Sequence, residues 1–318
     1  MLIAITGGTG FVGSRLVTLH LQRGDQVRVL ARPASNRTRV PSGVELIEAG
    51  ISTATPELGR FVANADVLYH CAGEYVDKQR MHATNVVGTR NLAGVASGKV
   101  RRWVHVSSVA VYGLGHTGSI NEESTLRPDS AYGKTKLEAE EIVRTAADKG
   151  AFQATILRPS TIFGHDMPGR LLFKLFALIE RGWFFRVGKP GAIMNYEHVN
   201  NVAAALMLCA THTGAVSRTY NLSQSISIDE FAAMIVDELN VPQSTLRLPE
   251  LPLRVIARIG SKIPRMPLTT DRLNALCSRV TYSSNKIEQE LAYTPTVPIE
   301  AGLRELAKNW QRGRRLGR

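Results

Sequence analysis

The sequence predicts an α/β protein built on a doubly wound parallel sheet, with helices on both faces and a smaller, mostly helical lobe. Three observations lead to this prediction. The apolar strand Leu2–Thr6 opens the chain and runs directly into a glycine-rich turn. Strand and helix patterns then alternate as far as Gly164, which is typical of parallel sheets. Beyond Gly164 the pattern becomes mostly helical and is interrupted by prolines.

The glycine-rich turn after the first strand is the most informative motif. Glycines at this position let backbone N–H groups and a helix N-terminus approach a phosphate, where a Cβ would hold the backbone away. The turn leads into a predicted helix over Phe11–Arg23. The alternative interpretation is a strand-to-helix turn that binds no ligand. The residues that we expect to bind the pyrophosphate of a dinucleotide are Gly7, Gly10, Phe11, Val12 and Gly13.

The next elements continue the alternation of strands and helices. Gly24, Gly98 and Gly150 end the helices that the apolar spacing predicts. Such strand–helix–strand units imply a parallel sheet covered by helices on both faces. The expected elements are strands Gln26–Leu30, Val44–Ile47 and Asp66–His70, helix His82–Ala96, strand Arg102–Ser107, helix Ala131–Lys149 and strand Phe152–Leu157.

The second half predicts a lobe of different character. Its elements are helices Pro168–Arg181 and Val199–Thr211 and strand Thr219–Leu222, with mostly helix from Ile228 onward. We expect residues 1–164 to form a dinucleotide-binding domain and residues 165–318 to form mainly a substrate-binding lobe. Segments around residues 190–222 are expected to return to the first domain. The lobe would then cover the carboxyl ends of the strands, where the ligands of such sheets bind.

Composition limits the classes of function. No apolar run approaches the length that spans a bilayer and no signal peptide begins the chain, so we expect a cytoplasmic protein without membrane partners. Cys71, Cys209 and Cys277 form no CxxC pair, which suits a reducing compartment and predicts no metal site. The net charge of +12 favours an anionic small-molecule substrate. No nucleic-acid-binding motif is present, so we expect no nucleic-acid partner. We leave open whether the protein forms a homodimer.

Tyr132 and Lys136 form the candidate acid–base pair. Four residues apart, they share one face of a predicted helix. An ammonium group beside a phenol favours the phenolate and lowers the pKa of the tyrosine, which suits proton transfer near neutral pH. Tyr282 and Lys286 repeat the spacing. Only the first pair follows a strand and loop that end at the cofactor edge of the sheet, so we interpret the second pair as structural.

Hydroxyl and amide side chains add to this candidate site. Ser107 and Ser108 end an apolar strand at the carboxyl edge of the sheet. A serine hydroxyl there can hydrogen-bond a substrate oxygen beside Tyr132, or it can simply cap the strand end. Asn85 opens a helical stretch and can satisfy backbone groups or a water molecule near Lys136.

Together these segments resemble the extended short-chain dehydrogenase/reductase family, in its epimerase/dehydratase branch. The matching segments are Thr6–Gly13, His70–Gly73, Asn85–Thr89, Ser107–Gly113, Tyr132–Lys136, Leu157–Gly164, Tyr196–Val199 and Lys286–Pro295. The resemblance implies an enzyme with a Rossmann fold, in which Ser108, Tyr132 and Lys136 are catalytic and Lys136 also binds the nicotinamide ribose. The further cofactor contacts that it implies come from Cys71, Ala72, Gly73, Asn85, Ser107, Tyr132 and Pro159.

Arginines near the end of the second strand indicate which cofactor is bound. NAD-binding relatives usually carry an acidic residue there for the ribose hydroxyls, whereas here Arg32 follows the strand and Arg37 lies close by in the sequence. Guanidinium groups favour a 2′-phosphate, so we expect NADP, with NAD as the alternative. Many relatives also place an aspartate against adenine where this chain has Ile51. A basic surface loop is the other interpretation of the two arginines.

The predicted substrate is a nucleotide-activated sugar or its 4-keto derivative. The enzyme would be an NADP-dependent oxidoreductase or epimerase that transfers hydride at a sugar carbon. Many nucleotide-sugar epimerases carry an arginine where this chain has Met194, so other basic residues would have to bind the diphosphate. The candidates for that role are Arg170, Lys174, Arg186 and Lys189.

The segment Tyr282–Leu303 supports a different substrate. It is similar to the dihydroflavonol-reductase and 3β-hydroxysteroid-dehydrogenase branch. The alternative function is therefore reduction of a small hydrophobic ketone, with Trp183, Phe184 and Phe185 either walling the pocket or packing in the core. A third hypothesis is a regulator that senses NADP without turnover, which the intact catalytic set argues against.

Overall fold

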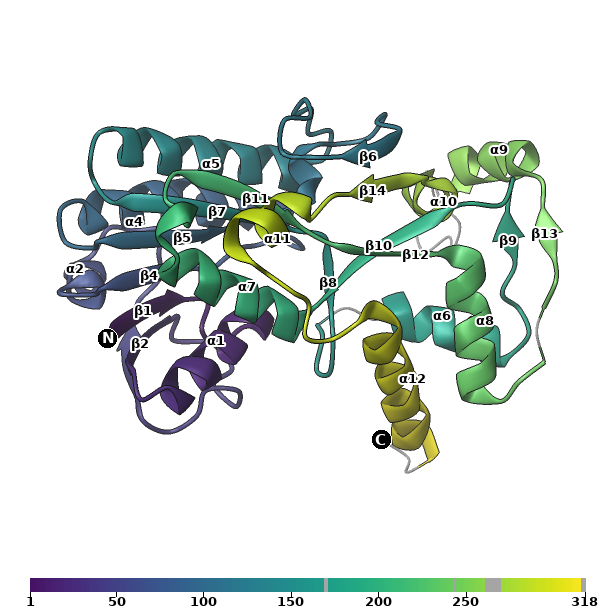
Figure 1. Cartoon of the computed structure of the whole chain (residues 1–318), viewed down its shortest axis with the longest axis horizontal. Helices are drawn as coiled ribbons and strands as arrows, with labels where there is room; N and C mark the ends of the chain where they lie inside the picture. Colours follow the sequence, from purple (N-terminus) through teal and green to yellow (C-terminus); the bar gives the residue numbers. More distant parts are fainter. Residues whose placement is uncertain (169–170, 243, 261–269, 316–318) are drawn as a thin grey trace.

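The computed structural model describes residues 1–168, 171–242, 244–260 and 270–315 (Figure 1). Its largest element is a seven-stranded parallel sheet, so the doubly wound α/β fold expected from the sequence is confirmed. The strands lie in the order β11 (Arg218–Leu222), β7 (Gln153–Pro159), β5 (Arg102–Val106), β4 (Val67–His70), β1 (Leu2–Thr6), β2 (Gln26–Ala31) and β3 (Val44–Glu48).

Helices bury both faces of this sheet. Alternate residues of β1 enter different cores, with Ile3 and Ile5 on one face and Ala4 on the other. A strand buried on both sides must be apolar throughout, which is why β1 lacks the alternation of a half-exposed strand. Helices α1 (Phe11–Gln22) and α7 (Val199–Thr211) cover the first face, and α2 (Pro56–Val62), α4 (Gly88–Ala96) and α5 (Ala131–Asp148) cover the second.

The crossover between β4 and β5 differs from the single helix expected over His82–Ala96. It begins earlier, as α3 (Lys78–His82), and passes through a π-helical turn over Ala83–Val87 before it becomes α4. Such wider turns are rare and often mark functional positions. Asn85 lies within this one.

The second half contains more strand than the sequence predicts. Its short strands are β8 (Thr161–Phe163), β10 (Ile193–His198), β12 (Gln224–Ser227), β9 (Arg186–Val187), β13 (Arg247–Leu248) and β14 (Val280–Tyr282). β10 pairs with β8 and β12, β9 pairs with β13, and β14 pairs with β6 (Gly118–Ile120) of the first half. Their apolar pattern is weak because buried polar groups pair internally: the Glu197 carboxylate accepts hydrogen bonds from Asn201 and Gln224.

Helices α6 (Leu171–Glu180), α8 (Ile228–Leu239) and α12 (Ile299–Arg315) surround a second core. Phe163, Phe176 and Phe231 lie in it, fully buried between the helices and the β10 sheet. None of the described helices is long and apolar enough to cross a membrane. Helices α9 (Glu250–Gly260) and α10 (Thr270–Cys277) pack in a smaller cluster around Val187, and α11 (Asn285–Leu291) packs in the core of the large sheet.

Candidate active site

The turn between β1 and α1 has no room for side chains at two of its glycines. Gly7 has φ of +68°, and a Cβ there would lie 2.8 Å from the backbone nitrogen of Ala72. A Cβ on Gly13 would lie 2.2 Å from the carbonyl oxygen of Gly7. Gly10 caps α1 without a side-chain hydrogen bond, so no side chain satisfies the first N–H groups of the helix. The turn therefore fits a phosphate held by backbone N–H groups.

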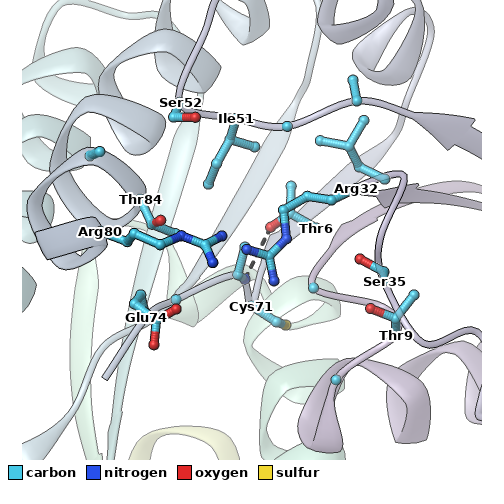
Figure 2. Close-up of a pocket in the computed structure, with 18 residues that line it drawn as sticks. Thr6, Thr9, Arg32, Ser35, Ile51, Ser52, Cys71, Glu74, Arg80 and Thr84 are labelled. Atoms are coloured by element: carbon cyan, nitrogen blue, oxygen red, sulfur yellow. Dashed lines mark hydrogen bonds between the residues drawn. The ribbon is translucent and has the colours of Figure 1, made fainter. Parts of the chain in front are cut away.

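A cavity of about 370 Å³ opens where β1, β2, β3 and β4 end, and we call it the strand-end cavity (Figure 2). This is the edge at which doubly wound sheets bind their ligands. Of the residues expected to bind a cofactor, the cavity is lined by Gly7, Gly10, Arg32, Cys71, Ala72 and Gly73. Sequence reasoning missed other polar residues of its wall, namely Thr9, Ser35, Ser52, Glu74, Arg80 and Thr84.

The other predicted cofactor residues of this region lie away from the cavity wall. Phe11, Val12 and Gly13 form the first turn of α1. Arg37 is ion-paired with Glu48 of β3. Arg32, in contrast, lines the cavity, and its guanidinium group makes no ion pair or hydrogen bond with a described residue. The structure therefore separates two arginines that the sequence placed together.

The loop that carries Ser108 packs against the start of α5. The Ser130 hydroxyl caps this helix by accepting a hydrogen bond from the Gly133 N–H at 3.0 Å. A Cβ on Gly133 would lie 2.4 Å from the carbonyl oxygen of Ala110, so glycine is what lets the helix approach. The approach brings the Ser108 hydroxyl close to the Tyr132 phenol.

Tyr132 keeps its proton at neutral pH. Burial raises the pKa of its phenol to about 12, and the nearby Ser108 hydroxyl opposes only part of this rise. From the sequence, we expected the Lys136 ammonium to lower this pKa. Lys136 Nζ instead donates a hydrogen bond to the Val106 carbonyl oxygen. The expected lowering is therefore wrong for the protein alone, because desolvation of the phenolate outweighs nearby charge.

Lys136 itself is buried, with 4% of its surface exposed. Burial lowers the pKa of its ammonium group to about 8, while the charge of Glu140 acts to raise it. Lys136 therefore remains charged at neutral pH but titrates in a range accessible to experiment.

One turn along α5 from Lys136 lies a set of side chains that we call the buried ion network: Ser107, Tyr112, Glu140, Arg158 and Asn221. Arg158 Nε and Nη2 donate to the two carboxylate oxygens of Glu140 at 2.9 and 2.7 Å. Ser107 Oγ donates to the same carboxylate. The Tyr112 hydroxyl accepts from Arg158 at 2.8 Å and donates to Asn221 at 2.8 Å. Burial alone would raise the pKa of Glu140, but Arg158 and Ser107 hold it below its ordinary value.

Asn85 ties the loop after β4 to α5. Its Nδ2 donates to Thr135 Oγ1 at 3.0 Å and to the Glu74 carbonyl oxygen at 2.9 Å. Its Oδ1 accepts a hydrogen bond from the Glu74 N–H at 2.7 Å. The amide thus fixes the loop relative to the helix that carries Tyr132. Pro159 lies buried at the end of β7.

Large apolar side chains stand exposed on the loops that follow β4 and β5 at the carboxyl edge of the sheet. Tyr75 and Val76, after β4, are 56% and 72% exposed, and Leu114, on the loop that continues from Ser108, is 62% exposed. Tyr75 is close enough to Tyr132 to contribute electrostatically to its raised pKa. We call these three residues the apolar rim.

The structure does not gather the basic residues expected to bind a diphosphate. Arg186 is buried in β9, where its Nε pairs with Asp229 at 2.5 Å. Lys174 lines a separate surface concavity between α6 and α12. Lys189 is exposed, and Arg170 lies outside the described residues.

Most other candidate residues of the lobe contribute to its packing. Met194 and Phe184 lie in the second core, and Phe185 packs beside a smaller cluster around Val187. Trp183 is 66% exposed.

The second tyrosine–lysine pair, Tyr282 and Lys286, takes part in two separate contacts. Tyr282 lies in β14 with its ring centroid 6.0 Å from that of Tyr112, whereas the Lys286 ammonium lies 5.8 Å from the centroid of the Tyr220 ring. Across the described residues, no three His, Cys, Asp or Glu side chains are grouped so that they could hold a metal ion.

Comparison with known proteins gives a family for this geometry. The sequence model described as the NAD dependent epimerase/dehydratase family matches residues 3–223. A 4-hydroxy-2-methyl-3-oxo-4-farnesyl-3,4-dihydroquinoline-1-oxide ketoreductase from Stigmatella aurantiaca is 28% identical, over 94% of this chain and 93% of the relative. UDP-glucose 4-epimerase from Vibrio cholerae is 25% identical, over 96% of this chain and 97% of the relative.

A solved structure shares the fold. UDP-glucuronic acid 4-epimerase from Bacillus cereus, in complex with NAD, superposes with a TM-score of 0.78 at 20% identity. The match covers 99% of this chain and 98% of that protein.

Proposed function

Because the chain belongs to the NAD-dependent epimerase/dehydratase family, we propose that it is an NADP-dependent reductase of a hydrophobic ketone. The observation that carries the proposal is the apolar rim on the loops after β4 and β5, of which Tyr75 lies near the protonated Tyr132. Tyr75, Val76 and Leu114 expose apolar surface at the same edge of the sheet as the candidate acid. Exposed apolar groups beside a reactive group favour an apolar ligand.

The residues of the strand-end cavity fit a dinucleotide. The glycine turn leaves a cradle that a Cβ on Gly7 or Gly13 would fill, and the cradle lies next to the uncapped start of α1. Arg32 on the cavity wall has no carboxylate partner among the described residues, which suits a 2′-phosphate and supports NADP over NAD. Bound NADPH supplies the hydride.

The protein's own groups supply the proton. A reductase needs a donor for the oxygen that gains negative charge, and Tyr132 retains its proton because burial raises its pKa to about 12. Ser108, which lies close to Tyr132, would hold the same oxygen. Lys136, charged and buried one helical turn further on, would bind the ribose and favour the phenolate after proton transfer.

A nucleotide sugar is the second candidate substrate. The likeness to UDP-glucose 4-epimerase and the net charge of +12 support it. The ion pair between Arg186 and Asp229 argues against it, because a diphosphate would have to compete with the carboxylate that already pairs with this buried arginine. The Stigmatella relative, whose named substrate carries a farnesyl chain, supports the hydrophobic ketone.

A substrate panel tests the proposal. Oxidation of NADPH would be followed with aryl and prenyl ketones in one arm and with UDP-, GDP- and TDP-sugars or their 4-keto derivatives in the other. We expect turnover with ketones and a loss of kcat/KM when Tyr75 and Val76 are replaced by serine. The matched control is Leu246→Ser, which removes a 53% exposed leucine beside β13. Turnover confined to the sugar arm would replace this proposal with the second candidate.

A further inference from the structure

Two arginines from different parts of the chain line the strand-end cavity. Arg32 follows β2, and Arg80 lies on α3, in the crossover after β4. Figure 2 shows their guanidinium groups pointing toward one another across the cavity. Neither guanidinium makes an ion pair or hydrogen bond with the described residues.

Nearby arginines form ion pairs with carboxylates, which these two do not do in the described part of the chain. Arg28 pairs with Glu45 at 2.7 Å, and Arg37 pairs with Glu48. The carboxylate that shares the cavity wall is Glu74, whose Oε1 accepts backbone N–H groups of residues 75, 76 and 77 at 3.0, 3.0 and 3.2 Å. Glu74 is thus engaged in holding its own loop, and its charge acts on the Arg80 guanidinium at a distance without forming an ion pair.

Like charges that face each other across a cavity repel, and an anion between them removes the repulsion. The loop after β3 contributes Ile51 and Ser52 to the wall, so no carboxylate from that side opposes an anion. Ser35 and Thr9 add hydroxyl groups. The cavity is therefore electrostatically prepared for a doubly charged group close to Arg32.

Arg80 is held in place by its helix. The Asp77 carboxylate caps α3 by accepting N–H groups of Gln79 and Arg80 at 3.0 and 3.3 Å. Met81, the next residue, is buried. A side chain on a capped and anchored helix loses less freedom on binding than one on a free loop.

We propose that Arg80 is a second specificity-determining residue for the cofactor, which binds the 2′-phosphate of NADP(H) from the side opposite Arg32. The inference rests on the NADP preference of the proposed function. The pyrophosphate is provided for separately by the glycine turn and the start of α1, whereas the Arg80 guanidinium faces Arg32.

Adenosine fragments isolate this contact from the rest of the cofactor. Dissociation constants would be measured by calorimetry for 2′,5′-ADP, which carries the 2′-phosphate, and for 5′-AMP, which lacks it. For Arg80→Gln we expect 2′,5′-ADP to bind on the order of 10- to 100-fold more weakly while 5′-AMP is unchanged, as for the loss of one charge-assisted hydrogen bond. Arg80→Lys should recover part of the loss.

The control removes an equal charge elsewhere. Arg101 is exposed just before β5, at the opposite edge of the sheet, so Arg101→Gln should leave both constants unchanged. If Arg80→Gln weakens the binding of both fragments equally, or of neither, the inference about Arg80 is overturned. A wild-type protein that binds 5′-AMP as tightly as 2′,5′-ADP overturns the NADP preference itself. If Arg32→Gln abolishes the preference for 2′,5′-ADP over 5′-AMP while Arg80→Gln leaves it intact, only the role of Arg80 is overturned.

Discussion

Arginine side chains on the two sides of the candidate site stand in opposite circumstances. In the buried ion network, Arg158 is 2% exposed and its guanidinium is satisfied by Glu140 and Tyr112. In the strand-end cavity, Arg32 and Arg80 are exposed and make no such contacts with the described residues. A satisfied charge holds the protein together, whereas an unsatisfied charge on a cavity wall is available to a ligand. The first region should therefore support the chemistry and the second should select the cofactor.

The largest effect should come from the Tyr132 phenol. We expect Tyr132→Phe to lower turnover on the accepted substrate about 10²- to 10⁴-fold, because only the proton donor is lost. NADPH affinity should change little, since the cavity is intact. Steady-state kinetics and calorimetry measure the two quantities. Tyr282→Phe is the control and should be nearly silent. Wild-type turnover in Tyr132→Phe would remove Tyr132 from the chemistry.

The next effect concerns the buried ion network. Glu140→Gln leaves Arg158 buried without its carboxylate and should lower the free energy of unfolding by about 3–5 kcal/mol. Urea denaturation measures this change at constant m-value. Glu138→Gln, two residues earlier on α5, is the control. Glu138 is partly exposed, with its nearest ion-pair contact at 3.7 Å, so its loss should cost under about 1 kcal/mol. Equal effects of the two variants would contradict the assignment.

A smaller effect is expected in the strand-end cavity. Arg32→Asp should reverse or abolish a preference for NADPH over NADH, because each well-formed charge-assisted bond contributes about 1.5–3 kcal/mol. The same change should leave the free energy of unfolding, measured without cofactor, almost unchanged, because Arg32 has no partner among the described residues. Calorimetry with both cofactors checks the first statement and a urea titration checks the second. Tighter binding of NADH than NADPH by the unmodified protein would refute the NADP assignment.

The smallest effect is a dependence on pH. Because burial lowers the pKa of Lys136 to about 8, its charge is present below that pH and is lost as pH rises through it. The kcat/KM for NADPH should then fall about threefold between pH 7.5 and 8.5, as for one ionisation. Tyr132, with a pKa near 12, stays protonated over this range. A flat profile up to pH 10 would show that the charge of Lys136 is not needed for cofactor capture.

Part of this site could be predicted from local motifs in the sequence. The glycine spacing of Gly7, Gly10 and Gly13 and the pair Tyr132 and Lys136 are set by neighbours in the chain, and the seven-stranded sheet follows from alternating patterns. The pairing of Arg37 with Glu48 could not be read in this way. It depends on how the loop after β2 folds back onto β3.

Two other features needed the folded chain. Arg80 reaches the strand-end cavity through α3, a short helix whose sequence carries no binding motif. The pKa of Tyr132 is raised by burial, a property of the surrounding loops rather than of the spacing to Lys136. The strands β10 and β12 were not predicted because their buried polar residues pair with one another and interrupt the apolar pattern.

The order in which the large sheet is completed bears on how the chain is made. β7 ends at residue 159, and its outer neighbour β11 begins only at residue 218. While the ribosome is still adding the residues between them, β7 is an open edge. The face of the sheet that carries Ile3 and Ile5 also stays uncovered until Val202 and Leu206 of α7 have been synthesised. A nascent chain arrested near residue 164 would expose an unpaired strand and an uncovered apolar face, both of which invite aggregation. We therefore expect a fragment that ends there to depend on chaperones, or on residues 199–222 supplied as a separate peptide.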